Sequence, residues 1–156
     1  MSDYQMSAEI IGAKELKEAF KKAPEVTARE LKNAVGDAMN DLRNIASNSA
    51  PHRTGALQGS IHSQGPFATS NNVHATVGSN LKYAPYQEYG TQPHIILAKN
   101  KKALANTQTG QFFGRRVFHP GFPGRFYFKK AIESVRPKFT EYISRAVGRI
   151  IDALKG

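Results

Sequence analysis

The side chains of this sequence that could perform acid–base or metal chemistry are five histidines and one glutamate. The histidines, at positions 52, 62, 74, 94 and 119, lack the i, i+4 helical spacing and the close pairs that are typical of metal ligands. Glu88 stands among Tyr83, Tyr86 and Tyr89, where burial could turn a carboxyl group into a general acid or base. No nucleophile, metal-ligand set or second carboxylate lies near Glu88 in the sequence. A structural role for Glu88 is therefore favoured over a catalytic one.

The common motifs of enzymes and cofactor sites are also missing from the sequence. The stretch GFPGR at 121–125 lacks the Gly-Lys-Ser/Thr ending of a phosphate-binding loop. No Gly-x-Ser-x-Gly turn is present to expose a serine nucleophile. The absence of cysteine excludes disulfides, thiolate metal sites and cysteine nucleophiles. We therefore expect that the protein is not an enzyme and that it uses no metal and no cofactor.

Positive charge is concentrated in the second part of the chain. The net charge is +10, but residues 1–50 carry seven Lys or Arg against eight Asp or Glu, whereas residues 51–156 carry fifteen against four. Such a field attracts phosphate backbones or acidic protein surfaces, although a solvated basic face that keeps the protein soluble is an equally good interpretation. The candidates for contact with a DNA backbone or another partner are Lys99, Lys101, Lys102, Arg115 and Arg116.

Helical periodicity marks the two ends of the sequence. A short strand is expected over residues 4–11 and a short helix over residues 13–22. A longer helix begins near Pro24 and ends before Pro51, with one apolar stripe formed by Leu31, Val35, Ala38, Met39, Leu42, Ile45 and Ala46. Residues 125–134 are expected to form a helix, and a second apolar stripe follows at Phe139, Tyr142, Ile143, Ala146, Val147, Ile150, Ile151 and Leu154.

Short segments bounded by Gly, Pro, Asn and Ser predict strands in the middle of the chain. They cover residues 60–64, 73–78, 95–98 and 112–118. Residues 99–111 between the last two are polar and basic, and we expect an exposed, mobile loop that orders on a partner.

An α+β fold follows from this pattern, namely a two-layer sandwich of an antiparallel sheet packed against long amphipathic helices. We expect one domain over residues 1–156, with a strand and helices in 4–50, the sheet in 59–118 and helices in 125–155. No apolar run approaches the length of a membrane-spanning helix, and the first twenty residues lack the basic start and apolar stretch of a signal peptide. Part of the C-terminal stripe could lie in a subunit contact.

Three segments stand out by their order and spacing. They are PHRTGALQGSI at 51–61, YAPYQEYGT at 83–91 and PGFPGRFYFKKAIES at 120–134. Together they resemble the pattern of the small tail-completion and head–tail joining proteins, similar to tail terminators, of long-tailed bacteriophages. The resemblance covers roughly residues 25–155. It departs from the family where Pro-Phe is usually followed by an aliphatic residue, because this chain has Arg-Phe-Tyr-Phe at 125–128.

Each segment has a structural task that its residue types favour. Thr54 can cap a helical turn, Gly55 can bend the chain, and Leu57 can enter the core. In the second segment, Pro85 can open one helical turn that stacks Tyr86 and Tyr89 on the sheet, and Gly90 can end that turn in the left-handed conformation. In the third segment, two Pro-Gly-type bends precede Phe126 and Phe128, which are expected to anchor the following helix. The candidate assembly residues are Thr54, Gly55, Leu57, Tyr83, Tyr86, Glu88, Tyr89, Gly90, Phe126 and Phe128.

The resemblance implies a structural virion protein that forms a homo-oligomeric ring, with six subunits to match the tail. Its implied partners are the tail tube protein and head-side connector proteins, and its implied locations are the neck or tail end of the virion and, during assembly, the host cytoplasm. The alternative function is non-specific nucleic-acid binding by a basic hairpin, with Phe112, Phe113 and Phe118 as a stacking surface. A hydrolase that uses Glu88 or the histidines is a third, much weaker hypothesis.

Any contact of this protein with DNA is expected to be blind to base sequence. Its basic residues are spread over loops and helices and are not gathered on one recognition helix, so contacts should be confined to the phosphate backbone. Competition binding at physiological salt, with one labelled duplex against scrambled duplexes, measures this. A marked preference for one duplex would contradict the prediction.

Overall fold

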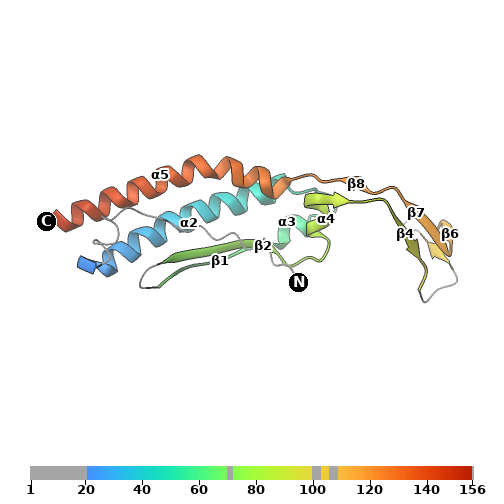
Figure 1. Cartoon of the computed structure of the whole chain (residues 1–156), viewed down its shortest axis with the longest axis horizontal. Coiled ribbons are helices and arrows are strands. Elements are labelled where there is room, and N and C mark those ends of the chain that lie inside the picture. Colours follow the sequence, from blue (N-terminus) through green and yellow to red (C-terminus); the bar gives the residue numbers. More distant parts are fainter. Residues whose placement is uncertain (1–20, 70–71, 100–102, 106–108, 156) are drawn as a thin grey trace. The chain divides into compact units, whose positions relative to one another are not determined.

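Figure 1 shows the computed structural model, which describes residues 21–69, 72–99, 103–105 and 109–155. The chain divides into two compact units, one made of Met1–Ala84 with Tyr127–Gly156 and the other of Pro85–Phe126. The division does not test whether the units fold separately, so the expectation of a single domain stays a prediction. The strand expected over 4–11 lies outside the described residues, as does most of the helix expected over 13–22, of which Lys21 and Lys22 are helical.

Helix α2, Pro24–Ser49, is the central element of the first unit and confirms the long helix expected there. Pro24 suits the first turn, where its missing N–H would have no intrahelical partner. The helix ends at Ser49, and the extended backbone of Ala50 is the conformation favoured before Pro51. Its buried residues are Thr27, Glu30, Leu31, Ala34, Val35, Ala38, Met39, Leu42 and Ala46.

Helix α5, Tyr127–Lys155, is continuous, which corrects the expectation of two C-terminal helices. Pro137 lies inside it and has no N–H to donate to the carbonyl of residue 133. Apolar burial continues on both sides of the proline, with Ala131 and Val135 before it and Ala146 and Ile150 after it. Because these residues belong to the same two core clusters as α2, packing holds the helix together through a residue that normally ends one.

A hairpin of two strands completes the first unit. Strands β1, Ile61–Ala68, and β2, Val73–Ser79, are antiparallel, with a bulge between Gln64 and Phe67. In Figure 1, α2 runs between this hairpin and α5. Val73 and Val77 of β2 are buried in the two clusters that α2 and α5 share. The predicted strands at 60–64 and 73–78 are thus confirmed, with β1 longer than expected.

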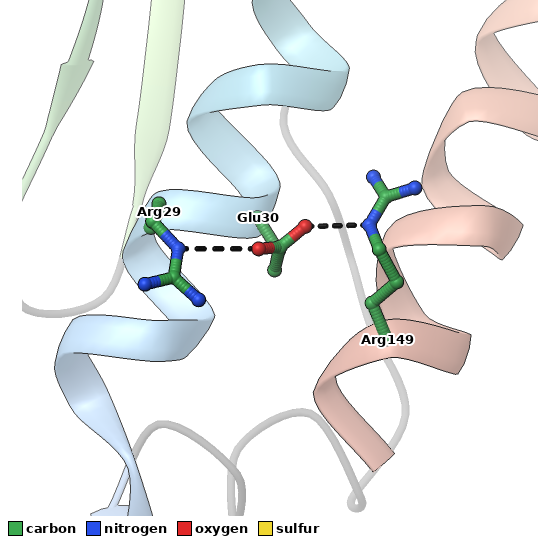
Figure 2. Close-up of polar contacts among 3 residues, drawn as sticks. All are labelled: Arg29, Glu30 and Arg149. Carbon is green, nitrogen blue, oxygen red and sulfur yellow. Dashed lines mark hydrogen bonds and ion pairs between the residues drawn. The ribbon is translucent and has the colours of Figure 1, made fainter. Parts of the chain in front are cut away.

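Two polar ties join α2 to α5. Nε of Arg149 donates to Oε2 of Glu30 at 2.5 Å, and Arg29 donates to the other carboxylate oxygen at 3.2 Å (Figure 2). Further along the helix pair, Nζ of Lys138 and the hydroxyl of Tyr142 donate to Oδ2 of Asp41 at 3.0 and 3.1 Å. The two ties are eleven residues apart on each helix, and eleven residues make about three turns. They therefore lie along one side of the antiparallel helix pair and fix its register.

These ties shift the ionisation of the groups that they join. The hydrogen bond from Arg149 is the main cause that lowers the pKa of Glu30, against the opposing effect of burial. The hydrogen bond to Asp41 is the main cause that raises the pKa of Lys138 and the pKa of Tyr142. The hydrogen bonds thus favour the ionised forms of Glu30 and Lys138 and the neutral phenol of Tyr142.

The α+β class is confirmed, but the strands do not join into the single antiparallel sheet that was expected. Four separate two-stranded pairs form among the described residues: β1–β2, β3–β8, β4–β7 and β5–β6. The segment expected as one strand at 112–118 is broken after Gly114, which has a φ of 82°. The remaining elements are α3 Ala56–Ser60, α4 Ala84–Tyr89, β3 Gly90–Thr91, β4 His94–Leu97, β5 Leu104–Ala105, β6 Phe112–Gly114, β7 Arg116–His119 and β8 Phe122–Pro123.

Within the part of the chain that the structure describes, no helix has the length and apolar character needed to cross a membrane.

Replacing Glu30 with Gln should lower the free energy of unfolding by about 1 kcal/mol at neutral pH, because a charge-assisted hydrogen bond to a half-exposed arginine is lost. The pKa of Glu30 is lower in the folded chain than its ordinary value of 4.5, so its contribution is present above pH 4.5 and is lost as the pH falls below it. Denaturant unfolding between pH 7 and pH 3 should show this slope in the unchanged protein and a weaker slope in Glu30→Gln. Glu133→Gln, at an exposed position of α5, is the control; equal pH profiles for all three proteins would refute the assignment.

Candidate assembly surface

The first of the three sequence segments forms a corner between a helix and a strand. The hydroxyl of Thr54 accepts a hydrogen bond from the N–H of Ala56 at 3.4 Å, at the start of α3. Gly55 has a φ of 76°, and Leu57 and Ile61 are buried in the core. The expected bend and core positions are therefore confirmed, whereas the N-cap of α3 is Gly55 and not Thr54. Thr54 itself is exposed, so a role for it in assembly stays a prediction.

The second segment forms the single helical turn that was expected, but its tyrosines do not lie on a sheet. Helix α4 contains Pro85, and Gly90 follows it with a φ of 79°. Tyr86 and Tyr89 are 56% and 52% exposed, and Tyr83 is also exposed, so the expected stacking of Tyr86 and Tyr89 is wrong. The strand that follows has only two residues and offers no sheet face to cover them.

The second and third segments meet through their backbones. Gly90 and Thr91 of β3 pair with Pro123 and Phe122 of β8. A Cβ at Gly90 would collide with the carbonyl oxygen of Phe122, and one at Gly121 would collide with the carbonyl oxygen of Thr91. Only glycine permits this close approach, and both glycines have positive φ. The glycines therefore set how closely the two segments can pack.

Two further hydrogen bonds hold the end of the third segment against α4. The N–H of Arg125 donates to the carbonyl of Gln87, and the N–H of Phe126 donates to the carbonyl of Glu88, both at 3.0 Å. Phe126 has a φ of 52°, a left-handed conformation that costs a non-glycine residue about 1–2 kcal/mol. Strain of this kind persists where the surrounding structure fixes the backbone, and it is enriched at functional sites.

An exposed group of three aromatic residues results, which we name the aromatic platform: Tyr86, Tyr89 and Phe126. The rings of Tyr89 and Phe126 meet edge to face, with centroids 6.4 Å apart. Tyr86 and Tyr89 are three residues apart on one helical turn and share a side of it. Glu88 between them is buried. All these residues are candidates from the sequence, whose local pattern does not indicate that the aromatic rings face outward.

The residue that anchors α5 in the core is Tyr127, and not the two phenylalanines that were expected to do so. Tyr127 is buried, whereas Phe126 is 40% exposed and Phe128 is only partly buried against the core. The signal for Tyr127 is present in the sequence, since Tyr127, Ala131 and Val135 follow one another at four-residue steps and all are buried.

Three of the five candidate basic residues gather at one end of the β4–β7 pair. Lys99, Arg115 and Arg116 are exposed; Arg116 pairs with Leu97, and the carbonyl of Arg115 accepts the N–H of Ala98 at 2.9 Å. Lys101 and Lys102 lie outside the described residues. Leu104–Ala105 forms β5 and pairs with β6, so the expectation of a loop over all of 99–111 is corrected there.

The structure brings together one pair of histidines that the sequence spacing did not indicate. His94 and His119 are directly opposite each other in the β4–β7 ladder, and their rings stack with centroids 5.0 Å apart. Nδ1 of His94 lies 2.8 Å from the carbonyl oxygen of Gln92, and Nδ1 of His119 accepts the N–H of Gly121 at 3.0 Å. One nitrogen of each ring thus serves the backbone. Across the described residues, no group of three or more potential metal ligands occurs.

Comparison with known proteins gives one match. The family model described as "Bacteriophage HK97-gp10, putative tail-component" matches residues 14–90. No curated protein and no solved structure matches the chain. The matched residues include α2, the α3 corner, the β1–β2 hairpin and α4, and they contain the first segment and nearly all of the second. The similarity to a phage tail-component family is therefore confirmed for this part of the chain, and the third segment lies beyond it.

Replacing Gly90 with Ala should loosen the second unit, because a left-handed residue would gain a Cβ that collides with the backbone of Phe122. Amide hydrogen exchange should then be faster at Arg125 and Phe126, whose N–H groups bond to α4. The matched control is Gly148→Ala on α5, where nothing lies within 4 Å of the new Cβ and helix propensity should stabilise the fold by up to about 1 kcal/mol. Unchanged exchange at Arg125 and Phe126 in Gly90→Ala would show that the close approach is unimportant.

Proposed function

Because residues 14–90 match a family of bacteriophage tail components, we propose that this chain is a subunit of a homo-oligomeric ring at the head–tail junction or tail end of a long-tailed phage. In this function the ring completes the tail and joins it to the head. Six copies would match the symmetry of the tail. The proposed partners are other copies of the chain, the tail tube protein and head-side connector proteins, and the protein works in the virion as a structural part without a chemical reaction.

The aromatic platform is the observation that supports an assembly role most directly. Tyrosine is enriched among the residues that dominate binding energy at protein interfaces, where a large ring is buried at a low entropic cost. Here two tyrosines and a phenylalanine are exposed together on a backbone fixed by β3–β8 pairing and by two hydrogen bonds to α4. Such a platform is preorganised for binding, which lowers the conformational entropy lost when a partner binds.

The first unit supplies the rigid part of such a subunit. Its two long helices share two core clusters and are tied by Glu30–Arg149 and Asp41–Lys138. A ring subunit transmits force and position between neighbours, and a doubly tied helix pair resists sliding along its axis. We propose the same structural role for Glu88, which is buried in α4 just before the chain enters β3.

A second candidate function is sequence-independent contact with DNA that passes through the ring. It is favoured by the exposure of Lys99, Arg115 and Arg116 at one end of the β4–β7 pair. Phe112, Phe113 and Phe118 are exposed as well, so they do not form the inward side of a strand. A dedicated nucleic-acid binder should show an affinity that falls steeply with salt, whereas a ring subunit should assemble without DNA.

Complementation of a phage that lacks this protein tests the proposal. Tyr86→Ser and Tyr89→Ser should leave the melting temperature nearly unchanged, because surface substitutions usually alter stability by less than about 0.5 kcal/mol, yet they should reduce the yield of infectious particles. Phe67→Ser, at an exposed aromatic of β1, is the matched control and should complement fully. Full complementation by both tyrosine variants would contradict the role of the platform.

Replacing Glu88 with Gln separates a structural role from a chemical one. The substitution keeps the volume of the side chain and removes its charge, so folding should persist and assembly should be weakened at most. Thermal melting, incorporation into particles and infectivity should be measured together. If infectivity were abolished while melting and incorporation stayed normal, Glu88 would have a chemical task and the structural proposal would fail.

A further inference from the structure

The strand pairs β3–β8 and β4–β7 follow one common register in the second unit. Gly90 is opposite Pro123, and a count of four residues along each strand arrives at His94 opposite His119 without an inserted residue. The two pairs are therefore stretches of one antiparallel ribbon. Two residues on each strand lie between them and belong to neither ladder, so the ribbon is interrupted there.

The regular pattern of an antiparallel ladder shows which hydrogen bond this interruption removes. The N–H of Ala98 donates to the carbonyl of Arg115, which is the next pair in the register of β4–β7. Hydrogen-bonded pairs alternate with non-hydrogen-bonded pairs along such a ladder. Counting back by twos from Ala98 makes Gln92 and Gly121 a hydrogen-bonded pair. In a regular ribbon, the N–H of Gly121 would therefore donate to the carbonyl of Gln92.

Proline does not account for this missing hydrogen bond. Pro93 and Pro120 are opposite each other in the same register, at a non-hydrogen-bonded position. There each backbone nitrogen points away from the other strand, so the absence of an N–H removes no bond between the strands. Other contacts must therefore occupy the N–H of Gly121 and the carbonyl of Gln92.

The two stacked histidines make these contacts. The N–H of Gly121 donates to Nδ1 of His119 at 3.0 Å, and Nδ1 of His94 lies 2.8 Å from the carbonyl oxygen of Gln92. A carbonyl oxygen only accepts, so His94 carries a proton on Nδ1; an N–H only donates, so His119 carries none there. The donor and the acceptor of one ladder hydrogen bond are thus each occupied by a histidine ring.

Gly121 lies close enough to the opposite strand for the ladder bond to form. A Cβ built on Gly121 would collide with the carbonyl oxygen of Thr91 and would lie 2.9 Å from the carbonyl carbon of Gln92. The φ of Gly121 is 77°, and glycine enters and leaves this left-handed region at little cost. A hollow of about 560 Å³, lined by residues 89–92 and 120–123, lies at the interruption and gives the backbone room to change conformation.

A proton on His119 would remove the acceptor that holds Gly121. Histidinium carries an N–H on both ring nitrogens, so Nδ1 loses the lone pair that accepts the N–H of Gly121. His94 differs, because it can take a proton on Nε2 and keep its bond to Gln92. Two positive rings stacked 5.0 Å apart would also repel each other. Protonation of His119 is therefore the step that releases Gly121.

His94 is the ionisable group that faces His119. Strand β7 packs against β4 and β6; His94 is the ionisable residue of β4, and β6 has none. The strands next along the ribbon, β3 and β8, carry none either. Arg116 lies three residues from His119 on β7 and therefore projects from the other face of the ribbon. The acidic residue of the second unit, Glu88, is buried in α4.

We propose that His94 and His119 form a proton-dependent latch in the ribbon of the second unit. When His119 is neutral, it holds the N–H of Gly121 and the ladder is interrupted. When His119 is protonated, the N–H of Gly121 bonds to the carbonyl of Gln92, and β3–β8 and β4–β7 join into one continuous ladder. Histidine changes its charge between about pH 5 and pH 8, so the ribbon has a different backbone arrangement on each side of this range. The latch does not depend on the proposed assembly into a ring.

NMR spectroscopy of the full chain, labelled with heavy nitrogen and carbon isotopes, tests the latch at pH 7.5 and pH 5.0. Scalar couplings across hydrogen bonds identify each donor and acceptor directly. At pH 7.5 the amide nitrogen of Gly121 should couple to Nδ1 of His119; at pH 5.0 it should couple instead to the carbonyl carbon of Gln92. The proposal is overturned if the first coupling persists when the ring nitrogen shifts show His119 to be charged. It is also overturned if the first coupling is lost and the second does not appear.

Replacing His119 with Phe keeps an aromatic ring and removes the acceptor. The coupling between Gly121 and Gln92 should then be present at both pH values. His62→Phe on β1 is the matched control, because Nδ1 of His62 also lies 2.9 Å from a carbonyl oxygen two residues earlier, and it should leave the couplings of Gly121 unchanged. If His119→Phe keeps the β4–β7 ladder but lacks the Gly121–Gln92 coupling at both pH values, the latch is contradicted.

Replacing His94 with Phe leaves the bond between His119 and Gly121 in place, so this test does not depend on the folding of His119→Phe. The carbonyl of Gln92 is then released, and no second positive charge opposes the protonation of His119. Both effects favour the continuous ladder. The pH at which the two Gly121 couplings are equally strong should rise by about half a unit or more, the size expected for two unit charges about 5 Å apart in water. An unchanged or lower midpoint would rule out His94 as part of the latch.

Discussion

The burial of helix α2 on two sides is the constraint on which the first unit depends. Leu31 and Leu42 are almost wholly buried, and alanines at 34, 38 and 46 let neighbouring elements approach closely. Each fully buried leucine contributes about 1.5–3 kcal/mol. Because α5 and the β1–β2 hairpin both use α2 as their packing surface, neither could bury its apolar side without it. The same packing explains why α5 continues through Pro137, since the loss of one backbone hydrogen bond is small beside the apolar burial on either side.

Polar contacts add direction to this packing. Apolar stripes allow two helices to slide past each other by a turn at modest cost, whereas a buried carboxylate tolerates only the position where its cation is present. Glu30 with Arg149 and Asp41 with Lys138 are spaced equally on both helices, so only one antiparallel alignment satisfies both. The first unit is thus stabilised by apolar burial and aligned by two ion pairs.

The second unit differs from the first, because backbone contacts and not a buried core determine its geometry. Its local geometry is tightly determined, through glycines that permit β3 and β8 to approach and through amides of Arg125 and Phe126 that bond to α4. Among its described residues, however, Glu88 is the one buried side chain, and the hydrophobic side chains are partly buried or exposed. A segment with an ordered backbone and exposed rings is suited to contact with another molecule. Most of this segment lies beyond residues 14–90, which match the family of tail components.

The sequence by itself determined the features that depend on neighbours along the chain. The 3.6-residue stripe of α2, the corner at Thr54–Gly55–Leu57, the turn that begins at Pro85 and the left-handed Gly90 follow from local periodicity and from backbone preferences. Only the tertiary structure decided which strands pair, that Tyr127 and not Phe126 is buried, that Tyr86 and Tyr89 face outward, and that His94 stacks on His119. The physical reason is that exposure and strand register depend on partners distant in sequence. An aromatic residue on one helical turn has the same local sequence pattern whether its ring is buried in a core or exposed on the surface.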